Sequence, residues 1–130
     1  MTEHDDEFVI PKRSLVSVVD DDESIRQALP DLLRQFGFAA ETFASAEAFL
    51  ASGLVSETSC LLLDVAMPGM SGPDLQQELA RLREKIPIVF ITGYGDASAL
   101  RALVAGGAVR CLVKPFSDAA LLDAVGAALT

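Results

Sequence analysis

The chain has 130 residues, of which 51% are apolar, and it carries a formal net charge of −9 at pH 7. This length fits a single domain with an ordinary buried core, and the negative charge argues against direct binding of nucleic acid by the domain. The sequence shows no basic start followed by an apolar stretch and no apolar run near the ~20 residues that cross a bilayer. We therefore expect a soluble, cytoplasmic protein without a membrane contact.

Residues 1–13 are polar and acidic and predict a flexible tail, whereas residues 14–130 alternate between two patterns. Short apolar runs predict buried strands, and longer runs with apolar residues three and four positions apart predict helices. In chain order, the expected strands cover 15–19, 38–43, 60–63, 87–91 and 109–113, and the expected helices cover 23–36, 45–52, 73–84, 96–107 and 117–130. Serines at two of the helix starts, Ser45 and Ser117, are suited to cap the free backbone N–H groups there.

This alternation predicts the fold class. Strands that are apolar throughout are typical of a parallel sheet covered by helices on both faces. With right-handed crossovers, such a chain forms a doubly wound, three-layer α/β domain. We expect a five-stranded parallel sheet with the flavodoxin-like strand order 2-1-3-4-5.

Polar residues mark the ends of four of the predicted strands. The first strand is followed by three aspartates at 20–22, the third by Asp64, the fourth by Thr92 and the fifth by Lys114. Because sites of open parallel sheets form beyond the carboxyl ends of the strands, we expect these residues to meet at one edge. Each of these residues alone could be an ordinary turn residue, helix cap or strand end. Their placement together at the ends of four strands would rarely arise by chance.

The chemistry of this set suits phosphoryl transfer. Clustered carboxylates repel one another and favour a bound cation, and hard oxygen ligands without His or thiolate suit Mg²⁺ or Mn²⁺. Such an ion neutralises charge on phosphoryl oxygens, and lysine and threonine side chains can each contact a further oxygen. An aspartate can itself attack phosphorus to form an acyl phosphate, so the residues predict a covalent aspartyl intermediate.

Four motifs carry a resemblance to a known family: VVDDD at 18–22, LDVAMPGMSG at 63–72, ITG at 91–93 and VKPF at 113–116. With these motifs in this order and spacing, the chain closely resembles the receiver domains of bacterial response regulators over residues 14–130. The stretches 91–96 and 45–50 resemble the subgroup that is often linked to helix-turn-helix output domains.

The resemblance implies an acceptor and a metal site. Asp64 is the expected phosphoacceptor of a phosphorylation-dependent switch. Asp21, Asp64 and the backbone carbonyl of Ala66 are the expected Mg²⁺ ligands, and Asp20 is expected to hold the metal through water.

The resemblance also implies how the phosphoryl group arrives and is sensed. Lys114, which precedes a cis peptide in the family, and Thr92 are expected to contact the phosphoryl group. The expected donor is a histidine kinase or a histidine phosphotransfer protein. The domain would then be a signalling module that catalyses only its own phosphorylation and dephosphorylation.

Three positions matter against the family's pattern: Cys111 departs from it, and Ala66 and Tyr94 lie where relatives flank the path of attacking water. Most relatives carry Tyr or Phe where this chain has Cys111, and that ring moves inward with the threonine. We therefore expect Thr92 to move without a ring-based readout, unless Cys111 is simply a small core residue. Ala66 offers no polar side chain, and Tyr94 would partly screen the phosphoryl group from water. Together they predict a long-lived phosphoaspartate. The alternative is that Tyr94 is an ordinary surface residue.

The last two helices are unusually apolar, with one charged residue each over 97–105 and 121–129. A helix that is apolar nearly all round needs cover on more than one side, so these helices predict a contact with a second copy or a partner. The alternative is that alanine, a good helix former, fills exposed positions.

Three other functions are compatible with parts of the sequence. A phosphatase that uses an aspartyl phosphate needs a second acid where this chain has Ala66. A flavin-binding electron carrier of the same fold needs a phosphate-binding loop after the first strand, where aspartates would repel a phosphate. A receiver that signals without phosphorylation normally lacks part of the acid, threonine and lysine set, which is complete here.

Overall fold

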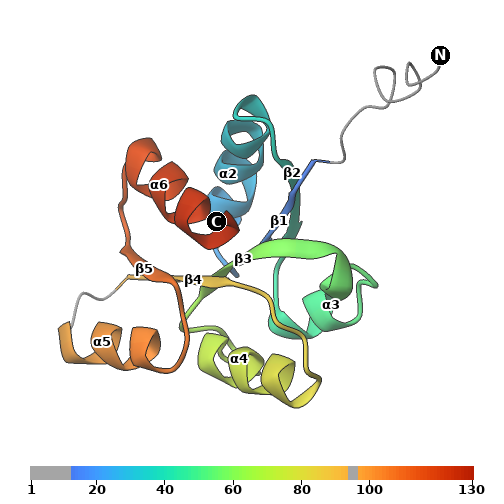
Figure 1. Ribbon diagram of the computed structural model, residues 1–130, viewed down its shortest axis with the longest axis vertical. Helices are drawn as coiled ribbons and strands as arrows, with labels where there is room; N and C mark the ends of the chain where they lie inside the picture. Colours follow the sequence, from blue (N-terminus) through green and yellow to red (C-terminus); the bar gives the residue numbers. More distant parts are fainter. Residues whose placement is uncertain (1–12, 94–96) are drawn as a thin grey trace.

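The computed structural model describes residues 13–93 and 97–130 and shows a parallel sheet with strand order β2-β1-β3-β4-β5 (Figure 1). The strands are β1 (Leu15–Val19), β2 (Ala39–Phe43), β3 (Thr58–Asp64), β4 (Ile88–Thr92) and β5 (Arg110–Val113). The helices are α2 (Glu23–Gln35), α3 (Ala46–Leu50), α4 (Gly72–Arg81), α5 (Ala97–Ala105) and α6 (Asp118–Leu129). The predicted fold class and strand order are confirmed.

Helices cover the sheet on both faces, with α2 and α6 on one face and α3, α4 and α5 on the other (Figure 1). Each face has its own apolar cluster, and alternate residues of β3 supply both. Leu62 packs with α2 and α6, while Leu61 and Leu63 pack with α3 and α4. A strand that is buried on both faces is mostly apolar along its middle, which is why residues 60–63 and 88–91 read as continuous apolar runs in the sequence.

The element boundaries differ from the expected ones where polar groups are buried or capped. β3 begins at Thr58, two residues before the expected start, because the Thr58 hydroxyl pairs with that of Ser17 at 2.8 Å inside the sheet. α4 ends at Arg81 rather than at residue 84, and Arg83 adopts a left-handed conformation with φ of 61°. A short 3₁₀ turn over Val55–Glu57 precedes β3 and was not expected from the sequence.

Side-chain caps fix the starts of several helices. Ser45 Oγ accepts the N–H of Ala48 at 3.0 Å, and Ser117 Oγ accepts the N–H of Ala120 at 3.0 Å, as expected. Within 13–93 and 97–130, no helix is long and apolar enough to cross a membrane. The predicted tail, apart from Arg13, and Tyr94 lie outside the described residues.

Candidate functional site at the carboxyl edge of the sheet

The predicted site residues lie at the carboxyl edge of the sheet, as the strand order requires. Asp20 follows β1, Asp64 ends β3, Thr92 ends β4 and Lys114 follows β5. The backbone ties these ends together, because the N–H of Lys114 donates to the carbonyl of Thr92 at 2.8 Å and the N–H of Asp20 donates to that of Phe43 at 3.1 Å. The fold therefore brings residues from the ends of four strands to one edge.

Three carboxylates form the centre of the site. One carboxylate oxygen each from Asp20, Asp21 and Asp64 lie within 4.8 Å of one another. Asp20 is fully buried, Asp64 is 6% exposed, and Asp21 is exposed to solvent. Like charges this close, two of them out of water, raise the free energy of the site unless a cation or a proton offsets them.

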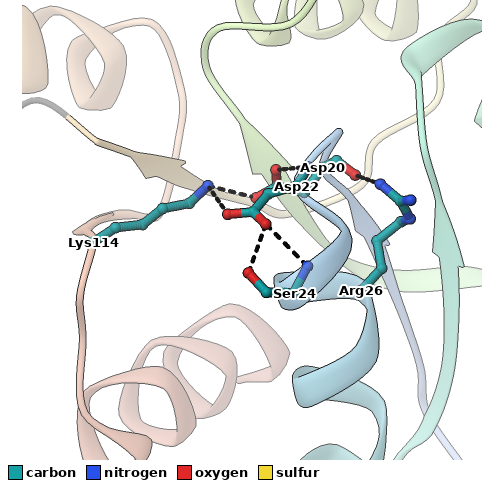
Figure 2. A network of polar contacts seen from close by, with 5 residues as sticks. All are labelled: Asp20, Asp22, Ser24, Arg26 and Lys114. Atoms are coloured by element: carbon teal, nitrogen blue, oxygen red, sulfur yellow. Dashed lines mark hydrogen bonds and ion pairs between the residues drawn. The ribbon is translucent and has the colours of Figure 1, made fainter.

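Lys114 supplies a positive charge beside Asp20 and Asp22 (Figure 2). Its Nζ lies 3.0 Å from Oδ2 of Asp20 and 3.9 Å from Oδ2 of Asp22. Burial alone would lower the pKa of Lys114. The contact with Asp20 and the negative charges of the nearby carboxylates have a larger, opposite effect, so the pKa of Lys114 is raised. Lys114 is therefore charged at neutral pH. The Lys114–Pro115 peptide bond is cis, as the resemblance implied.

The surroundings of Asp64 raise the pKa of its carboxyl. Burial is the main cause and the charge of Asp20 the next, and together they raise the pKa of Asp64 to about 7 despite the opposing charge of Lys114. A buried carboxyl next to a like charge behaves in this way generally. A divalent cation at the cluster would favour the ionised form, which is the nucleophilic one.

Arg26 is a contributor that the sequence pattern did not reveal. Its Nη1 donates to the backbone carbonyl of Asp20 at 3.0 Å, while Asp22 caps α2 by accepting the N–H and hydroxyl of Ser24 at 2.9 and 2.6 Å (Figure 2). Asp20 Oδ1 accepts the N–H of Asp22 at 2.9 Å. These bonds fix the turn that carries the aspartates at 20–22. No residue type or spacing in the sequence predicts the role of Arg26.

The donor set fits a hard divalent cation. Its ligand atoms are carboxylate oxygens, which Mg²⁺ and Mn²⁺ prefer. No hydrogen bond of good geometry reaches the buried Asp20 Oδ2 in the described part of the chain, and its ion-pair partner is Lys114. A buried oxygen of this kind retains capacity for a cation or for water bound to one.

The remaining predicted residues are spread around this centre. Ala66 is exposed in the loop after β3, two residues beyond Asp64. Thr92 is 7% exposed and lies one residue beyond Ile91, the register partner of Asp64. Cys111 is half-buried, pairs in register with Phe90 and packs on the α3 and α4 side of the sheet.

Comparison with known proteins shows the family of this chain. The model of the response regulator receiver domain family matches residues 16–126. The chain belongs to this family. It is therefore a receiver domain of the two-component response regulators, and the acidic cluster lies where the motifs of such a receiver were recognised in the sequence.

Individual relatives agree with this receiver assignment. Nodulation protein W of Bradyrhizobium diazoefficiens is 51% identical over 116 residues, which cover 89% of this chain and 51% of that protein. Response regulator protein TodT of Pseudomonas putida is 43% identical over 118 residues, covering 91% of this chain and 52% of that protein. The chain thus spans about half the length of the curated relatives that it matches.

Solved receiver structures share the fold. The response regulator StyR is 47% identical with a TM-score of 0.81, covering 90% of this chain and 59% of that one. FixJ-N is 36% identical with a TM-score of 0.80, covering 92% of this chain and 95% of that one. The receiver described here therefore has the sheet order and helix layers of its family.

Proposed function

We propose that Asp64 is the phosphoacceptor of this receiver and takes a phosphoryl group from a phosphohistidine of a histidine kinase or phosphotransfer protein. The observation that supports this most is the meeting of three carboxylates within 4.8 Å, with Lys114 Nζ 3.0 Å from one of them. In the reaction, an oxygen of Asp64 forms a bond to phosphorus as the bond from phosphorus to the histidine nitrogen breaks. The nitrogen keeps that electron pair, and the histidine leaves as neutral imidazole because the other ring nitrogen of the phosphohistidine carries a proton.

A Mg²⁺ or Mn²⁺ ion at this cluster would neutralise charge that develops on the phosphoryl oxygens. Its protein ligands would be Asp21, Asp64 and the carbonyl of Ala66, with Asp20 acting through a bound water. Asp20 is the buried acid and Asp21 the exposed one, which suits an ion that enters from solvent and retains water.

Lys114 and Thr92 would read the new phosphoryl group. Lys114 now pairs with Asp20, and a phosphoryl group on Asp64 would compete for its ammonium as an additional anion. The Thr92 hydroxyl would donate to a second phosphoryl oxygen. Because these contacts form in only one arrangement of the two side chains, phosphorylation would favour that arrangement over the resting one.

The readout of this switch would differ from that of most relatives at Cys111. A thiol is much smaller than an aromatic ring, so an inward movement of Thr92 would not draw a large side chain with it. Tyr94 would add a partial screen between water and the phosphoryl group, and the phosphoaspartate would be long-lived. Hydrolysis within seconds would contradict the Tyr94 proposal, and unchanged partner binding by Cys111→Tyr in both states would contradict a readout role for Cys111.

A groove of about 580 Å³ beside Lys114 is suited to the donor protein. It is mostly apolar, and its lining residues are Asp22, Ile25, Ala28, Leu29, Gly93, Lys114, Pro115, Phe116 and Asp118. Apolar side chains of a histidine-bearing helix would fit there, beside Lys114. Replacing the exposed Ala28 by Glu should slow transfer from a cognate kinase and leave transfer from acetyl phosphate unchanged; equal slowing of both would contradict this docking site.

The exposed face of α5 is suited to a second copy or an output domain. An open groove of about 660 Å³ between α5 and β5 is mostly apolar and is lined by Leu100, Arg101, Val104, Ala105, Val109, Arg110 and Cys111. α6 buries much of its apolar surface against the sheet, so α5 carries more of the predicted contact. The name transcriptional regulatory protein, given to the relative FixJ of Rhizobium meliloti, suggests an output that controls transcription.

Two further features belong to this proposal. The domain would catalyse only its own phosphorylation and dephosphorylation, because the nucleophile is one of its own side chains. It would work in the reducing cytoplasm, which the free thiols of Cys60 and Cys111 support.

Intact mass spectrometry tests the proposal. After incubation with Mg²⁺ and acetyl phosphate, the wild type should gain the mass of one phosphoryl group. The gain should be absent with Asp64→Asn and absent without Mg²⁺. A gain of equal size in Asp64→Asn would contradict the assignment of the acceptor.

A further inference from the structure

The loop between β3 and α4 carries the proposed ligand carbonyl of Ala66. Its first end is bonded to β4, and its second end is bonded to the first. The N–H of Val65 donates to the carbonyl of Ile91 at 2.9 Å, and the N–H of Gly72 donates to the carbonyl of Val65 at 2.9 Å. Between these ends, Pro68 and Gly69 in the outer part of the loop are exposed. The position of the ligand carbonyl therefore depends also on what holds the outer part of the loop.

Glu47 in the first turn of α3 holds that outer part. Its Oε2 accepts the backbone N–H of Met70 at 3.1 Å. Gly69 passes so close that a Cβ there would lie 2.7 Å from the same oxygen, and Gly69 also has a left-handed φ of 76°. The chain therefore meets the carboxylate at a glycine that no other residue could replace without displacing the loop or Glu47.

The same helix contacts the loop through apolar groups. Met67, between Ala66 and the outer part of the loop, is 8% exposed and shares an apolar cluster with Ala46 and Phe49 of α3. A short helix thus holds the loop at two places, one polar and one apolar. These places, Met67 and Met70, lie on either side of Gly69, where the backbone takes a left-handed φ of 76°.

We propose that Glu47 is a positioning residue for the metal site, acting through the backbone of Met70 on the loop that presents Ala66. It contacts neither the cation nor the phosphoryl group. Without its hydrogen bond, the loop would sample more conformations and the carbonyl would be presented less often in a binding position. This inference rests on the proposed function, because it requires Ala66 to be a metal ligand.

Direct metal binding tests the inference, with Mn²⁺ followed by electron paramagnetic resonance and Mg²⁺ by calorimetry. Glu47→Ala should raise the metal dissociation constant by about three- to tenfold, somewhat less than the loss of a partner that touches a ligand directly. Glu47→Gln keeps an oxygen acceptor of the same reach and should stay within about twofold of wild type. Glu47→Asp keeps the charge, but its shorter side chain does not reach the N–H of Met70. Its metal dissociation constant should therefore resemble that of Glu47→Ala, and it replaces Glu47→Ala if that variant does not fold.

Kinetics separate positioning from a general loss of stability. With acetyl phosphate as donor, Glu47→Ala should need more Mg²⁺ for half-maximal phosphorylation and reach the wild-type rate when Mg²⁺ is saturating. A matched control is Glu41→Ala, which removes an exposed carboxylate from β2 and should change neither quantity.

Two results would overturn the inference. One is a folded Glu47→Ala or Glu47→Asp that binds Mg²⁺ as tightly as wild type. The other is a Glu47→Gln as weak as Glu47→Ala, since the hydrogen bond would then not be the cause. Failure of the wild type to bind Mg²⁺ would instead contradict the proposed function itself.

Discussion

Asp20 joins the acidic and basic parts of the site through three of its oxygen atoms. Oδ1 accepts the N–H of Asp22, Oδ2 pairs with the ammonium of Lys114, and the backbone carbonyl accepts from Arg26. Because Asp20 is fully buried, loss of Lys114 would leave a carboxylate without its counter-charge, a change that typically costs about 3–5 kcal/mol in a protein interior. The resting position of Lys114 thus has a structural role besides its proposed one in the switch.

Asp64 makes the metal-free domain less stable as pH rises. Burial, with the charge of Asp20, raises its pKa to about 7 from the ordinary value of 3.8. The stability that protonated Asp64 contributes is fully present below about pH 4 and is lost as pH rises through about 7. At about pH 8 and without metal, Asp64→Asn should therefore be more stable than wild type by about 1–2 kcal/mol, a figure reduced for screening at the open edge.

Urea unfolding in a chelator measures this difference. The gap between Asp64→Asn and wild type should be larger at about pH 8 than at about pH 4, and added Mg²⁺ should narrow it at about pH 8 because the wild-type site binds the ion more tightly. A gap that is the same at both pH values would contradict the role of Asp64 ionisation.

The two thiols should differ in reactivity. Burial raises the pKa of Cys60 to about 12 and also raises that of the half-buried Cys111. Because the thiolate is the reactive form and Cys60 is fully buried, iodoacetamide should modify Cys111 well before Cys60. Peptide mass spectrometry over time measures both rates. Cys60 should react in urea, and equal rates in the folded protein would contradict the described burial.

At the scale of elements, the junction between β3 and α4 is the tightest part of the site. A Cβ on Gly72, the first residue of α4, would lie 2.3 Å from the backbone carbonyl of Asp64 and 3.1 Å from the Phe90 ring. The carbonyl belongs to the backbone of β3 and cannot move aside as a side chain can. Gly72→Ala must therefore displace the start of α4. We expect it to cost about 2–3 kcal/mol of unfolding free energy, as overpacking does elsewhere.

Gly126 in α6 is the matched control for this substitution. A Cβ there meets nothing within 4 Å, so Gly126→Ala should stabilise the helix by about 0.5–1 kcal/mol. Urea denaturation of both variants measures the contrast. A Gly72→Ala protein as stable as wild type would show that the approach of α4 to β3 is looser than described.

Element types and order could be predicted from the sequence, because apolar periodicity and serine caps are local signals. Contacts between distant elements could not. Glu47 binds the N–H of Met70, 23 residues further along the chain, with no sequence pattern to join the two. The local bond from Arg26 to the carbonyl of Asp20 also has no signature in the sequence. The buried hydroxyl pair of Ser17 and Thr58 likewise extends β3 by a contact that no propensity describes.

At the scale of the whole molecule, β5 links the site to the proposed contact surface. Lys114 follows this strand at the site, and Cys111 within it lines the groove beside α5. In the proposed switch, a change in the position of Lys114 would therefore occur close along the chain to a surface where another protein could detect it.

Self-association tests that surface. Val104 on α5 is 45% exposed, so Val104→Glu should change folding little and should weaken any dimer that forms with a phosphoryl analogue. Leu82→Glu is the matched control, because Leu82 is equally exposed at the end of α4, outside the groove. Sedimentation measures the dimer. A wild type that stays monomeric at high concentration with and without the analogue would refute the dimer, and equal weakening by both variants would point to a different face.

The most direct test of the central claim locates the phosphoryl group on Asp64. Reduction by borohydride after phosphorylation converts an aspartyl phosphate to homoserine, and trypsin leaves Asp64 on the peptide 35–81 and the aspartates 20–22 on the peptide 14–26. We predict homoserine at residue 64 in the presence of Mg²⁺, and unmodified aspartates at 20–22. Homoserine on the peptide 14–26, or none at residue 64 in protein that has gained a phosphoryl group, would contradict the account.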